Sequence, residues 1–174
     1  MIKIIDNVFD EKDVDVLYAE FRDNMSWTFR GEAFDDSNWR KFHMFLNKED
    51  PVHSKLFDKS DELFKETLPS LSKTHELKNN YASGYLYGTH HQIHTDYDKG
   101  GFTVMFYLNK LWDVSYAGET IFLNNIGDIT NSVIPKPGRV VIFDGTIPHA
   151  AREVSRICVE LRMVATFKYQ VGNT

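Results

Sequence analysis

The sequence predicts an α+β fold, in which N-terminal helices pack on one sheet of a double-sheet jelly roll. Apolar residues recur at helical spacing in two stretches before residue 70. From residue 81 onward, short segments rich in β-branched and aromatic residues alternate with turns that contain Gly, Pro or Asn. Two helices followed by about eight strands are typical of two packed sheets with the helices on one outer face.

The chain has 174 residues, which fits a single domain over residues 1–174. We expect residues 1–79 to form a supporting strand and helices, and residues 80–169 to form the strand-rich core. The 13 Phe, 8 Tyr and 3 Trp supply enough large apolar side chains for an extensive interior.

Charge and composition argue against several kinds of binding partner and cellular setting. The net charge of -5 argues against nucleic acid and anionic membranes, because phosphate contacts need clustered Lys and Arg. No apolar run approaches the roughly 20 residues of a membrane span, and Met1 to Asp6 lacks the apolar stretch of a secretory signal. The single Cys158 excludes an intramolecular disulfide and favours a reducing, cytoplasmic setting. The sequence carries no signal for an oligomeric state.

The N-terminal part begins with a short predicted strand from Ile2 to Val8. Asp10 has the form of a helix N-cap, and the helix is predicted over residues 11–25. Its apolar side consists of Val14, Leu17, Tyr18, Phe21 and Met25. Residues 26–30 and 39–46 are expected to be extended.

A second helix is marked at both ends. Asp50 is its expected cap, Pro51 occupies the first helical position, and Pro69 ends it. One side of this helix is apolar and consists of Val52, Leu56, Leu63 and Phe64.

Five main strands are predicted in the second half. They are Tyr81–Tyr87, Phe102–Leu108, Thr120–Leu123, Arg139–Phe143 and Val159–Tyr169. Turns are predicted at Gly100-Gly101, Asn124-Asn125, Gly127-Asp128 and Pro135-Lys136-Pro137-Gly138.

The functional prediction starts from the triplet His94-Thr95-Asp96. Alternate residues of a strand point to the same face, so His94 and Asp96 are expected to project together. His149 follows a Pro-Gly turn and an apolar strand, which puts it on a facing strand of a jelly roll. Two imidazoles and one carboxylate leave open positions on one side of Fe(II), as non-haem iron oxygenases require. The same set also binds zinc in hydrolases.

Arg162 is a charge within an otherwise apolar predicted strand. A buried guanidinium is costly unless an anion neutralises it. The partner is either a ligand carboxylate, whose planar geometry suits arginine, or Glu160 on the same strand face. Arg156 lies in a polar stretch before the strand and is expected to be solvated.

Several segments stand in a set order around these residues. They are Tyr87-Gly88-Thr89, His94-Thr95-Asp96, Phe106-Tyr107-Leu108-Asn109, Ala117-Gly118-Glu119-Thr120, Pro135 to Asp144, His149 and Arg162. In this order they resemble the Fe(II)- and 2-oxoglutarate-dependent dioxygenases, in the prolyl 4-hydroxylase-like branch and nearest to its small stand-alone bacterial and viral members. The resemblance covers about residues 80–169, which would then be the catalytic core.

The resemblance implies a double-stranded β-helix core in which His94, Asp96 and His149 bind Fe(II). The cosubstrates would be 2-oxoglutarate and O2, with ascorbate in support. Oxidative decarboxylation of 2-oxoglutarate to succinate would be coupled to hydroxylation of a substrate, which is either peptidyl, such as a prolyl residue, or a small molecule. No catalytic residue is expected beyond the metal ligands.

The resemblance also implies how the cosubstrate is held. Arg162 would pair with the distal carboxylate of 2-oxoglutarate, and the Tyr107 hydroxyl would bond to the same group. Thr166, four residues beyond Arg162 on the same strand face, would be a further contact. Tyr107 and Thr166 could instead serve only as core residues. Tyr85 and Tyr87 share a strand face and are candidates to line the pocket.

One departure separates this chain from the prolyl hydroxylases proper. Their basic anchor lies nine or ten residues after the distal histidine, and those positions here are Cys158 and Val159. The anchor has therefore moved to Arg162, and the substrate pocket need not match theirs. The alternatives are a jelly roll that binds without catalysis and, less favoured, a zinc hydrolase.

Turn-rich segments are candidates for a substrate gate, because loops on a rigid scaffold commonly carry specificity. They are residues 31–38, 97–101 and 111–117. Trp39, Trp112 and Tyr116 would either close over a ligand or pack on the outer sheet. The segment Ala117 to Thr120 is expected to be a structural turn, and His90-His91 is expected to lie in a loop.

Overall fold

The structure, a computed structural model, describes residues 1–23, 26–30, 41–89 and 91–172. In chain order its elements are β1 (Ile2–Ile5), α1 (Glu11–Asp23), β2 (Thr28–Arg30), β3 (Lys41–Met44), α2 (His53–Thr67), η1 (Leu71–Lys73), β4 (His75–Tyr85), β5 (Gly101–Tyr107), η2 (Val114–Tyr116), β6 (Thr120–Leu123), β7 (Ile129–Val133), β8 (Val140–Asp144), β9 (His149–Ala151) and β10 (Arg162–Val171).

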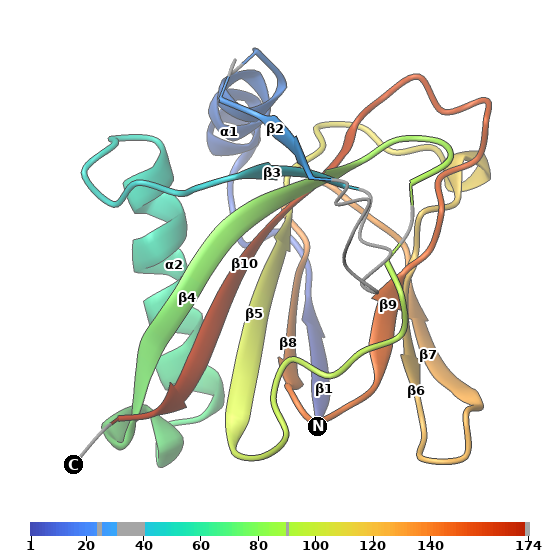
Figure 1. Cartoon of the computed structure of the whole chain (residues 1–174). Coiled ribbons are helices and arrows are strands. Elements are labelled where there is room, and N and C mark those ends of the chain that lie inside the picture. Colours follow the sequence, from blue (N-terminus) through green and yellow to red (C-terminus); the bar gives the residue numbers. More distant parts are fainter. Residues whose placement is uncertain (24–25, 31–40, 90, 173–174) are drawn as a thin grey trace.

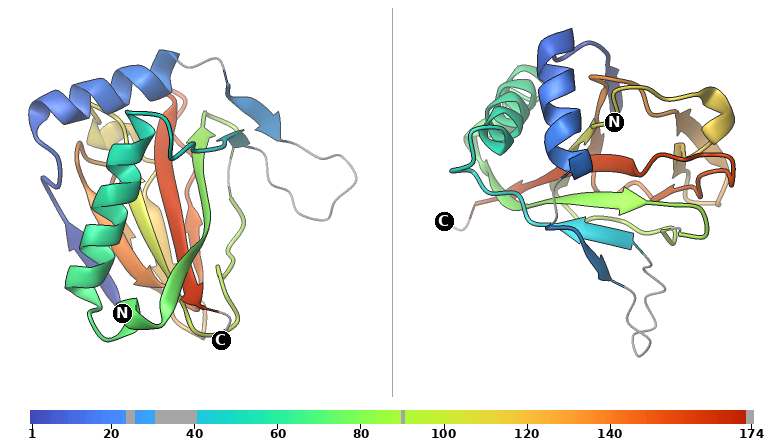
Figure 2. Two further views of the ribbon diagram at one scale, coloured as in Figure 1. Left: turned by 90° about the vertical axis from the view of Figure 1, so that its left-hand side faces the viewer. Right: turned by 90° about the horizontal axis from the view of Figure 1, so that it is seen from above.

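The strands form two antiparallel sheets that face each other (Figure 1). The larger sheet has the strand order β1-β8-β5-β10-β4-β3-β2, and the smaller has the order β7-β6-β9. Both α-helices lie on the outer face of the larger sheet (Figure 2). The predicted α+β jelly roll with helices on one sheet is therefore confirmed.

Helix α1 starts after its predicted cap, Asp10, whereas α2 starts at His53, so the prediction of Pro51 as its first helical residue is wrong. The Asp10 carboxylate accepts a hydrogen bond from the Asp13 amide at 2.8 Å at the start of α1. The Asp50 carboxylate accepts from the amides of Val52 and His53 at 2.8 and 2.9 Å, in the turn that leads into α2. These bonds satisfy amides that have no partner within the helix.

Strand β10 divides the interior into two layers. Its residues Met163, Ala165 and Phe167 face the helices and form one core with Phe21 of α1 and Leu56 of α2. Burying a large apolar side chain of this kind stabilises the fold by roughly 1.5–3 kcal/mol. This layer fixes the position of β10 against α1 and α2.

The alternate residues of β10 face the smaller sheet. Val164 packs there in a second core with Phe122 of β6 and Phe143 of β8. Arg162 and Thr166 point to the same side and line a cavity between the sheets. The prediction that Arg162 and Thr166 share one face of this strand is confirmed.

Two strands start several residues away from their predicted starts. Strand β4 begins at His75, six residues earlier than expected, and β10 begins at Arg162 instead of Val159. Strand β7 is mostly polar and exposed, and β9 has only three residues, so neither has a clear apolar pattern in the sequence. Among the described residues, no helix is both long and apolar enough to cross a membrane.

Candidate metal centre

The three predicted metal ligands lie together at one end of the space between the sheets. One ligand atom from each of His94, Asp96 and His149 falls within 4.8 Å of the others. The Nε2 atoms of His94 and His149 lie 3.6 and 3.8 Å from the Asp96 carboxylate oxygens.

Backbone hydrogen bonds set this arrangement. His94 and His149 form an isolated antiparallel bridge, with N to O distances of 3.0 and 2.9 Å. The Asp96 amide donates to the Gly145 carbonyl at 2.8 Å. The triplet was predicted to lie on a regular strand, which is wrong, because only His94 pairs in strand fashion. The two side chains nevertheless converge, since both residues are tied to the β8–β9 segment.

Both histidines present the nitrogen that a metal needs. The Nδ1 atom of His94 lies 2.9 Å from the Gln92 carbonyl, and that of His149 lies 2.9 Å from the Ile147 carbonyl. A carbonyl can only accept, so each Nδ1 donates, and a neutral ring in this tautomer carries its lone pair on Nε2. Burial lowers the pKa of His149 to about 4, so this ring is neutral near pH 7.

The Asp96 carboxylate is held by two partners besides the histidines. The Thr103 hydroxyl donates to Oδ2 at 2.5 Å, and the Lys168 ammonium lies 2.6 Å from Oδ1. Burial by itself would raise the pKa of Asp96, but the interactions with His94 and Lys168 outweigh it and hold the pKa well below its usual value. The site therefore offers two imidazoles, of which that of His149 is neutral, and one ionised carboxylate.

Arg162 is fully buried at the other end of the cavity. Its Nε donates to the Gly118 carbonyl at 2.5 Å and its Nη2 donates to the Thr120 hydroxyl at 2.9 Å. The guanidinium carbon lies 5.3 and 5.4 Å from the ring centres of Tyr85 and Tyr107. Burial raises the pKa of Tyr85 to about 12, so this ring is neutral beside the charge.

Arg162 has no carboxylate partner among the described residues. Its Nη1 atom is buried and makes no hydrogen bond to any residue that the structure describes. The alternative partner, Glu160, instead accepts a hydrogen bond from the Tyr18 hydroxyl at 2.8 Å. Within the described part of the chain, the charge of this buried cation is therefore not neutralised by a carboxylate.

The comparison with protein families covers the same part of the chain. Residues 79–169 match the family model described as the 2OG-Fe(II) oxygenase superfamily. This chain belongs to that superfamily.

As a 2-oxoglutarate- and Fe(II)-dependent oxygenase, the chain is an enzyme of the dioxygenase type, as predicted. No curated protein matches its sequence. Among solved structures, a prolyl-4-hydroxylase from Pseudomonas putida matches with a TM-score of 0.78 and 16% identity, over 99% of this chain and 93% of that one.

Two further structures share the fold. The viral collagen prolyl hydroxylase from Paramecium bursaria Chlorella virus-1, in its 2-oxoglutarate complex, matches with a TM-score of 0.71 and 16% identity over 98% of this chain and 96% of that one. HygX from Streptomyces hygroscopicus, with nickel, 2-oxoglutarate and hygromycin B bound, matches with a TM-score of 0.69 and 13% identity over 98% of this chain and 82% of that one. These structures share the fold, and the family model confirms the predicted resemblance at the level of the 2OG-Fe(II) oxygenase superfamily.

The predicted cosubstrate residues of this oxygenase lie at different distances from its cavity. Thr166 and Tyr85 line the cavity together with Arg162. Tyr107 does not line it, and its hydroxyl donates to Thr120 at 2.8 Å and approaches the Val133 carbonyl at 3.1 Å. Tyr107 thus contacts the hydroxyl that in turn binds Arg162.

Tyr87 lies outside the cavity, contrary to the prediction. Strand β4 ends at Tyr85, and the following turn leaves the Tyr87 side chain 59% exposed. Tyr87 instead lines a second hollow with Ile93, Glu119 and Arg152. We call this second space the outer hollow.

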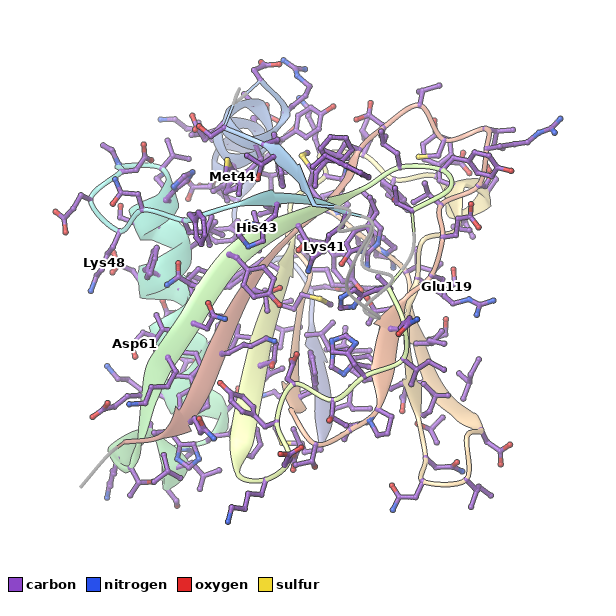
Figure 3. All side chains as sticks on the ribbon, viewed as in Figure 1. Lys41, His43, Met44, Lys48, Asp61 and Glu119 are labelled. Atoms are coloured by element: carbon purple, nitrogen blue, oxygen red, sulfur yellow. The ribbon has the colours of Figure 1, made fainter. Side chains whose placement is uncertain are left out.

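The oxygenase cavity has lining residues that the prediction did not include. His91 is buried, with its ring 4.2 Å from that of His94, and burial lowers its pKa to about 2. Lys41 is buried at the start of β3, at the end of that strand nearest the smaller sheet (Figure 3). His90 lies outside the described residues.

Lys168 and the turn before β6 were also missed. Lys168 has the strand parity of Arg162 and Thr166, so its direction could have been predicted. Gly118 and Thr120 lie in the segment that was expected to be only a structural turn, yet both bind Arg162.

The predicted gate aromatics do not line the cavity in the described part of the chain. The rings of Trp112 and Tyr116 pack on each other at 5.6 Å, and the Trp112 Nε1 donates to the Ala117 carbonyl at 3.0 Å. They support the turn that binds Arg162, which favours the packing alternative. Trp39 and residues 31–38 lie outside the described residues.

Proposed function

We propose that this oxygenase binds Fe(II) through His94, Asp96 and His149 and binds 2-oxoglutarate with its distal carboxylate on Arg162. In the reaction, 2-oxoglutarate would be converted to succinate while a substrate is hydroxylated. The observation that carries this proposal is the pairing of the metal triad with a fully buried arginine in one cavity. One nitrogen of the arginine has no hydrogen-bond partner among the described residues.

The donor set fits Fe(II). Two neutral imidazoles and a carboxylate form the set typical of non-haem iron oxygenases. When bound, Fe(II) with 2-oxoglutarate and O2 supplies the oxidative decarboxylation and the oxidation of a substrate C–H bond. The protein orients the ligands through the Gln92 and Ile147 carbonyls, which fix both histidine rings.

The arginine end of the cavity fits a dicarboxylic cosubstrate. A planar guanidinium binds a carboxylate through two parallel hydrogen bonds. We assign Thr166 as a direct contact because it lines the cavity. Tyr107 would act indirectly, because its hydroxyl contacts Thr120, which binds Arg162. The rings of Tyr85 and Tyr107 beside the guanidinium would keep water away from this ion pair.

The outer hollow is our candidate for the substrate. It shares His91 and Ala151 with the metal cavity, so a substrate there lies next to the triad. Exposed Tyr87 and Ile93 provide apolar contacts, and Glu119 and Arg152 provide charges at its edge. Both a peptide and a small molecule are compatible with this lining, as the viral collagen prolyl hydroxylase and HygX act as precedents for each class.

Two supporting features complete the proposal. We propose ascorbate as a reductant that keeps the iron as Fe(II) between turnovers. We also propose a cytoplasmic, reducing location, with the free thiol of Cys158 as its support.

The alternatives predicted from the sequence are less favoured. A zinc hydrolase has no use for a buried arginine facing the same cavity as the metal ligands. A jelly roll that only binds would have no need for a complete triad beside a carboxylate anchor.

The direct test is an anaerobic titration with Fe(II) and 2-oxoglutarate. The wild type should develop a weak visible charge-transfer band, and His94→Ala and His149→Ala should each abolish it. His75→Ala is a matched control, because His75 packs against Phe64 and Phe102 away from the triad. An unchanged band in either ligand variant would remove that histidine from the site.

The substrate is then sought by succinate release. The enzyme is incubated with Fe(II), ascorbate and 2-oxoglutarate, and prolyl peptides and free amino acids are screened for stimulated succinate formation. Absence of any succinate, with or without these compounds, would contradict the proposed reaction.

A further inference from the structure

Two residues outside the ligand set each contact one oxygen of the Asp96 carboxylate. Thr103 lies on β5 and Lys168 on β10, and the two are direct partners in the antiparallel register. The Thr103 hydroxyl bonds to Oδ2 at 2.5 Å, and the Lys168 ammonium contacts Oδ1 at 2.6 Å. Each carboxylate oxygen therefore has its own partner on the larger sheet.

We propose that Thr103 and Lys168 act on metal binding in opposite directions. Thr103 orients the Asp96 carboxylate toward the metal, and Lys168 competes with the metal for the charge of that carboxylate. This inference rests on the proposed function, because it requires that His94, Asp96 and His149 bind the metal.

Thr103 is suited to a positioning role. Its side chain is buried, and its hydroxyl adds a hydrogen bond without adding charge. The backbone of Asp96 is tied to Gly145, but this bond does not fix the rotation of the carboxylate. Loss of a partner that orients a metal ligand typically weakens metal binding 10- to 100-fold.

Lys168 has a different effect because it carries a charge. Its side chain is only 14% exposed, and its ammonium lies 5.5 Å from the Tyr81 ring centre, so water screens it weakly. A cation in contact with a ligand carboxylate repels a divalent metal bound to the same group. Lys168 therefore lowers the affinity that the three ligands alone would give.

The charge effect should dominate when Lys168 is replaced. In Lys168→Met the Thr103 bond to Oδ2 and the Asp96 backbone bond to Gly145 both remain, so the carboxylate keeps its orientation. Methionine has nearly the shape of the lysine stem, so packing against Tyr81 is also kept. The main change is the loss of one positive charge next to the metal.

The test is a calorimetric titration of purified protein with Co(II) alone at fixed pH, followed by the visible spectrum of the bound Co(II). Thr103→Val should weaken Co(II) binding about tenfold or more, and its spectrum should change because the ligand geometry changes. Lys168→Met should strengthen Co(II) binding by on the order of tenfold. Neither change is expected of a residue that only supports folding.

Three controls separate these effects from general damage. Thr103→Ser keeps the hydroxyl and should restore wild-type affinity, and Lys168→Arg keeps the charge and should stay close to the wild type. Lys78→Met removes an exposed lysine that pairs with Glu76 and should change nothing. Thermal unfolding followed by circular dichroism checks that each variant is folded.

The outcomes are distinct. Unchanged affinity in Thr103→Val, or weaker binding in Lys168→Met, would overturn the inference while leaving the metal site intact. Failure of the wild type to bind Co(II) and Fe(II) would overturn the proposed function, and the inference with it.

Discussion

Arg162 has the largest side chain among the fully buried residues of the described chain. Its charge is held by a carbonyl, a hydroxyl and two aromatic rings, none of which is an anion. A desolvated guanidinium of this kind is stable only with additional compensation. The carboxylate of 2-oxoglutarate is the compensation that the proposed function supplies.

Arg162→Ala should therefore raise the 2-oxoglutarate requirement at least thirtyfold. Removal of one member of a desolvated charge pair typically costs about 2–5 kcal/mol, or on the order of 30- to several-thousand-fold in affinity. The KM for 2-oxoglutarate is measured from succinate formation, and Co(II) binding should be retained. Arg156→Ala is the matched control, because Arg156 is exposed. A larger effect in Arg156→Ala would refute the assignment of the anchor.

Gly118 is a second residue whose identity the site requires. It has a φ of +74°, and a Cβ there would lie 2.8 Å from Val154 Cγ1 and 3.1 Å from Arg162 Cδ. Alanine is strained at such a φ and would also displace the arginine. Gly118→Ala should raise the KM for 2-oxoglutarate and lower the melting temperature together. Gly127→Ala is the control for the φ alone, because Gly127 has a φ of +91° and open space around it. Equal effects in the two variants would exclude a specific role of Gly118.

At the scale of elements, strand β10 packs against the helices with one face and carries residues of the candidate site on the other. One set of its alternate residues packs under α1 and α2, and the other set carries Arg162, Thr166 and Lys168. A shift of one residue in its register would exchange the two sets. The antiparallel pairing with β4 and β5 on both sides prevents this shift.

The start of α2 gives a prediction with a defined dependence on pH. Asp50→Ala should lower the free energy of unfolding by about 1 kcal/mol at pH 7, because the Asp50 carboxylate accepts from the His53 and Val52 amides. The hydrogen bond from the His53 amide lowers the pKa of Asp50 below its ordinary value of 3.8. Between the folded and the unfolded pKa, the unfolded state binds more protons at Asp50 than the folded state does. The stabilisation by the Asp50 charge is therefore fully present above pH 3.8, and it is lost as the pH falls through the lower pKa of the folded state.

Urea unfolding at several pH values measures this effect. Asp50→Asn keeps an acceptor for the amides but does not titrate. The stability difference between the wild type and Asp50→Asn should therefore shrink between pH 5 and pH 3. A difference that stays constant over this range would show that the charge of Asp50 contributes nothing.

At the scale of the whole molecule, the triad joins two parts of the chain that lie far apart in the sequence. His94 and Asp96 precede β5, and His149 begins β9 of the smaller sheet. A bound metal would connect the loop before β5 to the smaller sheet. Ligand binding of this kind stabilises the folded state, because the unfolded chain does not hold the three groups together.

Saturation with Co(II) should therefore raise the melting temperature. At a free concentration one hundred times the Kd, the stabilisation is about 2.7 kcal/mol, which corresponds to roughly 5–10 °C for a domain of this size. Differential scanning calorimetry measures the shift, and a chelator should reverse it. His94→Ala should show no shift, and a full shift in that variant would place the metal elsewhere.

The sequence by itself determined the features that depend on neighbouring residues. The Asp10 cap and the shared strand face of Arg162 and Thr166 follow from local spacing, and the structure agrees with them. The structure brings the three predicted ligands together, although the strand assumed for His94 and Asp96 was wrong, and their binding of metal stays a prediction. Their convergence follows from the His94–His149 bridge and the bond from the Asp96 amide to Gly145, and not from a regular strand.

Only the tertiary structure decided which distant residues meet. The contacts of Asp96 with Thr103 and Lys168, and of Arg162 with Gly118 and Thr120, join side chains from separate strands and turns. The exit of Tyr87 from the cavity depends on where β4 ends. These features depend on strand register and on the path of turns, which long-range packing sets and local spacing does not encode.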